Sequence, residues 1–154
     1  MTEPYLPPSE FLQSLIEDDA PLLGADADKN IGRVIELTKD EHPANRDWAT
    51  LILAQQEADR SDIHQALLAA AEDENEYVRA EAILGLAQRD KAVALPLLQR
   101  ELGGDLVALP LFEAAAIVAD ASLVDYLRAF ASPSDEVFMD ELAAKALRAC
   151  EAAN

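Results

Sequence analysis

A helix-forming pattern recurs along this 154-residue chain at intervals of about thirty residues. Its clearest copy is DENEYVRAEAILGLAQRD, residues 73–90. There Val78, Ala82 and Leu86 recur every four residues, with Ile83 beside them. At 100° per residue these side chains form one apolar stripe along a helix. Because part of the stripe is made of small residues, a neighbouring helix can approach closely.

The beginning of this segment carries a helix start signal. Asp73 can accept hydrogen bonds from the free N–H groups of a first helical turn. Glu76 follows three residues later, as in a capping box. The pattern therefore predicts a helix over residues 75–88 that Asp73 caps.

The apolar pattern returns at near-constant spacing, which predicts four pairs of helices joined by short turns. Connections this short force antiparallel hairpins, and a hairpin of this size buries its apolar face only when neighbours stack on it. Strand-like alternation of β-branched residues is absent from the sequence, so we expect an all-α fold. The expected pairs are 30–39 with 46–57, 62–72 with 75–88, 92–102 with 106–120, and 122–131 with 135–151.

The chain divides into an N-terminal extension, residues 1–29, and the array of helix pairs, residues 30–154. Residues 1–9 hold three prolines, so we expect an extended or disordered start. Ser9 can cap a short helix over residues 10–17, whose apolar face would cover the open end of the array. Alternatively, that helix is offered to a groove of a partner protein.

Segment 73–87 resembles a HEAT repeat of the short bacterial kind, the PBS-lyase-type HEAT-like repeat. The shared pattern is an acidic turn, then Val-Arg, then Ala pairs and Leu-Gly. The resemblance covers about residues 30–150 and weakens outside the second pair. At the places of Val and Arg, the other pairs carry Asn45-Arg46, Pro110-Leu111 and Met139-Asp140. The resemblance implies a right-handed α-solenoid of about four hairpins.

The resemblance also carries expectations about function. Most members of this family are scaffolds or binding modules, a minority acts on bilin chromophores, and some distant relatives bind damaged DNA. The family's arginine pairs with acids of an adjoining turn, so we expect Arg46 and Arg79 to be structural, with Asp73 or Asp40 as their partners.

In such arrays the second helices line the concave side. If the apolar stripe of residues 73–90 faces the core, then Tyr77, Ala80, Glu81, Leu84 and Gln88 point away from it, and the repeat spacing transfers this set to the other pairs. We call this surface of the second helices the inner face. We predict that it binds a partner, because it combines aromatic groups with carboxylates. The predicted binding residues are Asp47, Trp48, Leu51, Glu76, Tyr77, Glu81, Leu84, Phe112, Glu113, Phe138 and Glu141. Alternatively, the array curls or dimerises and Trp48 is ordinary core.

The formal net charge of −18, from 30 acidic and 12 basic residues, restricts the partner. Such a charge repels nucleic acids and anionic membranes and attracts basic proteins. We therefore expect a monomer or weak dimer that acts as a scaffold for a basic or amphipathic protein. The alternatives are an acidic inhibitor or immunity-type protein that blocks the basic cleft of a nuclease or toxin, a bilin lyase-like module, and a charge that serves solubility alone.

The sequence offers no constellation typical of catalysis or metal binding. His42 and His64 lie apart, without a Cys/His cluster of metal spacing. A calcium loop beginning at Asp26 fails, because its sixth and twelfth places are Ile31 and Leu37. We therefore expect no enzyme activity, no cofactor and no metal.

The single cysteine excludes an internal disulfide, and we interpret Cys150 as a small apolar core residue. The N-terminus lacks a basic segment followed by an apolar one, so the sequence predicts no signal peptide. No apolar stretch is long enough to span a bilayer. We expect a cytoplasmic protein.

Overall fold

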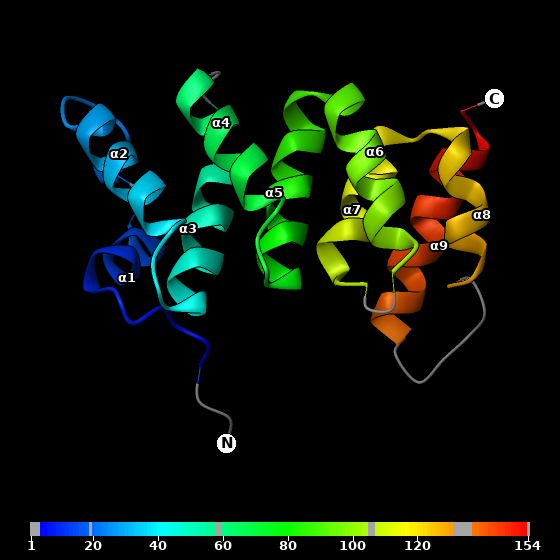
Figure 1. The fold of residues 1–154 in the computed structure, drawn as a ribbon, viewed down its shortest axis with the longest axis horizontal. Helices are drawn as coiled ribbons and strands as arrows, with labels where there is room; N and C mark the ends of the chain where they lie inside the picture. The colour runs from blue at the N-terminus through cyan, green and yellow to red at the C-terminus, as the bar shows by residue number, and fades with distance from the viewer. Residues whose placement is uncertain (1–3, 19, 58–59, 105–106, 131–136, 154) are drawn as a thin grey trace.

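The computed structural model describes residues 4–18, 20–57, 60–104, 107–130 and 137–153. Within these ranges every regular element is helical, as predicted. The helices follow one another in a row along the long axis of the molecule (Figure 1). The elements are α1 (Glu10–Glu17), η1 (Ala20–Leu22), α2 (Ala27–Leu37), α3 (Pro43–Ala54), α4 (Ser61–Ala70), α5 (Glu76–Arg89), α6 (Lys91–Leu102), α7 (Leu109–Val118), η2 (Ala121–Leu123), α8 (Val124–Arg128) and α9 (Val137–Glu151).

The helices pair as the repeat predicts, α2 with α3, α4 with α5, α6 with α7, and α8 with α9. The second helices also pack on one another in chain order, α3 on α5, α5 on α7 and α7 on α9. The first helix α6 packs both on its partner α7 and on α5 of the preceding pair. The arrangement is an α-solenoid in which one apolar core runs through all pairs.

The N-terminal helix α1 begins at the predicted residue, because the Ser9 hydroxyl accepts a hydrogen bond from the Leu12 N–H at 3.3 Å. Its buried side chains are Leu12 and Leu15. The Arg33 guanidinium of α2 lies 3.8 Å from the centre of the Phe11 ring. α1 thus joins the core at the α2–α3 end of the array, as expected of a capping helix.

The cap of α5 differs from the prediction. Asn75 is the N-cap, and its side-chain oxygen accepts hydrogen bonds from the N–H groups of Tyr77 and Val78 at 2.8 and 3.2 Å. Asp73 lies two residues before this N-cap, and its carboxylate accepts a hydrogen bond from the Asn75 N–H at 2.9 Å. Because a capping side chain bonds N–H groups two or three residues ahead, Asp73 stands too early in the chain to cap a helix that begins at Glu76.

Both helices of the first pair begin three residues earlier than expected, at Ala27 and Pro43, and departures of another kind occur in the third and fourth pairs. α7 spans Leu109–Val118. Its C-cap residue, Ala119, has a φ of +50°, which places it in the left-handed region. The predicted helix over residues 122–131 is a 3₁₀ turn followed by the short α8, and the Asp120 carboxylate accepts from the Ser122 N–H at the start of that turn. The beginning of the predicted helix 135–151 lies outside the described residues.

Gly85 lies where α5 approaches α3 and α4 closely. A Cβ atom there would lie 2.8 Å from the Ala54 Cβ and 3.0 Å from the Leu67 Cδ1. The backbone of α5 therefore presses directly against α3 and α4, which only a residue without a side chain permits.

At the C-terminal end of the array, Cys150 of α9 is buried, and its thiol donates to the Ala115 carbonyl at 3.5 Å, consistent with a core role.

Candidate functional site

The candidate site is the inner face of the second helices. A pocket of about 310 Å³ opens on it between α3, α5 and α7. Leu51 and Leu84, both half-buried, give this pocket apolar surface, and Glu81 and Glu113 give it carboxylates. No lysine or arginine is among the described residues that line it. These are Leu51, Ala54, Gln55, Glu81, Leu84, Gln88, Pro110 and Glu113.

Two carboxylates on the neighbouring second helices, Asp47 of α3 and Glu113 of α7, act on Glu81, which lines this pocket. Burial, together with the negative charges of Asp47 and Glu113, raises the pKa of the Glu81 carboxyl from 4.5 to about 7. Burial also raises the pKa of Asp47, and a hydrogen bond from Tyr5 opposes that rise. Burial and the two neighbouring carboxylates therefore both disfavour the ionised form of Glu81, and a cation placed beside it would favour that form.

The raised pKa of Glu81 predicts how the stability of the protein depends on pH. Because the folded-state pKa of Glu81 lies above the unfolded value, the folded protein holds a proton between about pH 4.5 and pH 7 that the unfolded chain releases. The free energy of unfolding therefore falls as pH rises through this window. We expect Glu81→Gln, which removes the charge, to be more stable than the parent by roughly 1–3 kcal/mol at pH 8.

Urea unfolding at pH 5 and pH 8 checks this prediction, because most of the advantage of Glu81→Gln disappears at pH 5. Glu36→Gln is the matched control, since Glu36 is an exposed acid of α2. Its effect on stability should be equal at the two pH values. A Glu81→Gln variant with the same stability difference at both would contradict the assigned pKa.

A second pocket continues the inner face toward the C-terminal end. It has a volume of about 430 Å³ and lies between α7 and α9. Glu113 lines both pockets, so they adjoin at this residue. Lys145 makes this second pocket mixed in charge, and the acidic part of the inner face is the part on α3, α5 and α7. The lining is Phe112, Glu113, Ala116, Ile117, Leu142 and Lys145.

The remaining predicted residues vary in exposure. Tyr77 has 51% of its surface exposed, and Glu141 is also exposed. Asp47 and Glu76 are half-buried. The side chain of Phe138 lies outside the described residues.

The prediction that Phe112 is exposed on the inner face is wrong. Its ring is fully buried and makes an edge-to-face contact with Phe130 at a centroid distance of 5.4 Å. Ala80, which the repeat spacing places at the same helical position, is also fully buried instead of pointing away from the core. This position faces the core because the flanks of α5 and α7 are covered by neighbouring second helices.

Trp48 is half-buried and packs against the core, while its indole Nε1 is buried without a hydrogen-bond partner among the described residues. The ring of Tyr5 stacks on it at a centroid distance of 6.0 Å and an interplanar angle of 26°. The Tyr5 hydroxyl donates to the Asp47 carboxylate at 2.9 Å. Sequence reasoning missed Tyr5, because a contact across such a long chain separation leaves no local periodic signal.

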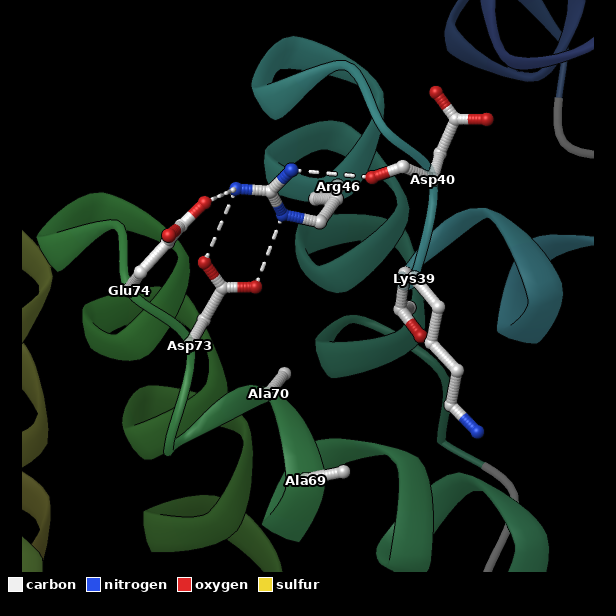
Figure 2. A pocket seen from close by; sticks show the side chains of 8 residues that line it. Lys39, Asp40, Arg46, Ala69, Ala70, Asp73 and Glu74 are labelled. Carbon is white, nitrogen blue, oxygen red and sulfur yellow. Dashed lines mark hydrogen bonds and ion pairs between the residues drawn. The ribbon is translucent and has the colours of Figure 1, made fainter.

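Arg46 lies in a different pocket, of about 390 Å³, on the edge formed by the turns within the pairs (Figure 2). Its Nε lies 3.0 Å from Asp73 Oδ2, and its Nη1 donates to the carbonyls of Asp40 and Glu41 at 3.1 Å each. A weaker ion pair reaches Glu74 at 3.5 Å. These groups satisfy one another, so Arg46 joins the first pair to the second, as expected.

Arg79 repeats this arrangement one pair further on. Its Nη1 donates to the Asp73 carbonyl at 3.0 Å, and its Nε lies 2.8 Å from Glu101 Oε1 on α6. The other oxygen of Glu101 accepts from Arg100 Nε at 2.9 Å. The predicted structural role of Arg79 is thus confirmed, but its carboxylate partner is Glu101 and Asp73 contributes its backbone oxygen.

The described residues offer neither a metal site nor a membrane-spanning helix. They contain no group of three or more His, Cys, Asp or Glu side chains placed to hold a metal ion. Among the helices that the structure describes, none is long and apolar enough to cross a membrane.

A family model described as HEAT repeats matches residues 32–116, which is more than half of the chain. The chain belongs to the HEAT-repeat family. Within it, the chain is 35% identical over 117 residues to Protein YibA of two Escherichia coli strains. That match covers 76% of this chain and 39% of the relative, so the chain spans well under half the length of these relatives.

The fold is similar to that of a solved HEAT-repeat relative. The X-ray structure of Escherichia coli YibA superposes with a TM-score of 0.62 at 25% sequence identity. The superposition covers 92% of this chain and 54% of that one. The α-solenoid described above is therefore an experimentally observed arrangement in a related protein.

Proposed function

We propose that this HEAT-repeat protein is a non-catalytic binding module whose inner face holds a basic, amphipathic segment of another protein. The observation that carries the proposal is the pocket between α3, α5 and α7, where Glu81 and Glu113 stand beside Leu51 and Leu84. A lysine or arginine has an apolar stem and a charged end. Such a side chain would place its stem on the leucines and its charge between the carboxylates.

The raised pKa of Glu81 supports a cationic ligand over a neutral one. A positive charge beside Glu81 favours the ionised carboxylate, so binding would release a proton wherever Glu81 is protonated in the free protein. Affinity for a cationic ligand should therefore be higher at pH 8 than at pH 6. In Glu81→Gln this dependence on pH should be weaker, because the titrating group is gone.

Fluorescence anisotropy with three labelled peptides tests the proposal. The first is a helical peptide with lysines on one face and leucines on the other. The second has the same composition in scrambled order, and the third has glutamate in place of each lysine. We expect the first to bind, the scrambled peptide to bind more weakly, and the glutamate peptide not to bind.

Salt gives the second part of this test. Attraction between the acidic pocket and the lysine peptide should weaken clearly as ionic strength rises from about 0.05 to about 0.3 M. Equal binding of the lysine and glutamate peptides would contradict the proposal, as would an affinity that ignores salt. Equal binding of the ordered and scrambled lysine peptides would show attraction by charge alone, and the apolar part of the proposal would fail.

A further inference from the structure

The segment before α1 is held by one hydrogen bond to α3 and by one to α1. The Ser9 N–H donates to the buried Asn45 side chain of α3 at 3.0 Å. The Pro7 carbonyl accepts from Gln13 Nε2 at 2.8 Å, and Pro7 itself is buried. Between these two contacts and the contacts of Tyr5 with α3, the segment is fixed at both of its ends.

Tyr5, in this segment, contacts two of the predicted binding residues, Asp47 and Trp48. Its hydroxyl donates to Asp47 and its ring stacks on Trp48. Asp47 is also one of the two carboxylates whose charge acts on Glu81, so the tyrosine hydroxyl occupies an oxygen of a group that acts on this pocket residue. The tyrosine remains 57% exposed, which means that the contact buries little area and can open without disturbing the core.

We propose that residues 4–9 form a strap that covers the α3 end of the inner face, and that a partner must displace Tyr5 to use Asp47 and Trp48. The strap is an internal competitor that lowers the affinity of the inner face and restricts it to partners long enough to displace it. This inference rests on the proposed function for the partner, but the docking of the strap can be measured without one.

The docking is measured through Trp48, the only tryptophan of the chain. Removing the stacked ring in Tyr5→Ala exposes the indole, so we expect its emission to shift to the red and its quenching by acrylamide to increase. Tyr126→Ala is the matched control, because Tyr126 is an exposed tyrosine of α8, far along the array from Trp48. The control should leave both signals unchanged. Unchanged signals in Tyr5→Ala would overturn the strap, whatever the protein binds.

The competition is measured by titrating each protein with the lysine–leucine peptide. Stacked aromatic pairs contribute enough that their loss should tighten peptide binding about three- to tenfold in Tyr5→Ala. Tyr5→Phe keeps the ring and loses the hydrogen bond, so it should fall between the parent and Tyr5→Ala. Binding by Tyr5→Ala with none by the parent would be the strongest form of the expected result.

Different results would contradict the competition by the strap and the proposed binding function. If the fluorescence changes as expected but peptide affinity is unchanged or lower in Tyr5→Ala, the strap docks without competing and the inference is overturned while the proposed function stands. If neither protein binds the peptide, the proposed function fails and the competition fails with it. The fluorescence result then still decides whether Tyr5 docks on Trp48.

Discussion

Arg46→Met is expected to lower the free energy of unfolding by about 3–5 kcal/mol, the cost of removing one partner from a buried ion pair. The Arg46 side chain is 10% exposed and the Asp73 side chain 12% exposed. Methionine keeps much of the apolar stem, but it leaves the Asp73 carboxylate without its cation. The carbonyls of Asp40 and Glu41 also lose their donor.

Urea unfolding followed by far-UV circular dichroism measures this loss. Arg128→Met is the control, because the Arg128 side chain is 63% exposed and pairs with Asp125 at 3.5 Å within one helix. It should change stability little. An Arg46→Met variant within about 1 kcal/mol of the parent would contradict a role for the buried pair in joining the first two repeats.

Gly85→Val is expected to cost about 3 kcal/mol, at the upper end of what overpacking a core usually costs. The new Cβ would meet Ala54 and Leu67 at distances that force α5 away from α3 and α4. Valine has a better helix propensity than glycine, so the loss can come only from packing. The variant should also unfold at lower urea concentration without a change in helical content at zero urea.

Gly32→Val separates packing from propensity. Gly32 lies inside α2, and nothing lies within 4 Å of the position its Cβ would take. We expect this variant to be as stable as the parent or slightly more stable. A similar loss in both variants would show that the close approach at Gly85 is not what limits substitution there.

The sequence repeat predicted the architecture because the apolar residues recur at the same helical spacing in each helix pair. The stripe of Val78, Ala82 and Leu86 is fully buried, and α5 begins one residue later than expected. The same spacing located Leu51, Glu81, Leu84 and Glu113, which line one pocket. Residues that repeat at the same helical position come together because the second helices stack in chain order.

The positions of Phe112 and Tyr5 could not be predicted from the spacing of apolar residues. The apolar stripe of a second helix, assigned within one hairpin, predicts only its contact with the first helix of that hairpin. The two flanks of the same second helix, however, also contact the second helices of the neighbouring hairpins. Phe112 and Ala80 lie on such a flank and are buried there. Tyr5 reaches Asp47 and Trp48 only because the chain folds back along α3, which no local spacing encodes.

In the function proposed above, the acidic pocket of the inner face, and not the net charge of the protein, binds the partner. Two double variants of equal net charge test it by titration with the lysine–leucine peptide. One is Glu81→Lys with Glu113→Lys on the inner face. The other is Glu17→Lys with Glu36→Lys, at exposed positions of α1 and α2.

We predict that the inner-face variant loses at least tenfold in affinity, a change of about 1.4 kcal/mol. The α1–α2 variant should stay within about threefold of the parent, because distant surface charges are largely screened at physiological salt. Equal losses in the two double variants would contradict the account, since the peptide would then respond only to total charge.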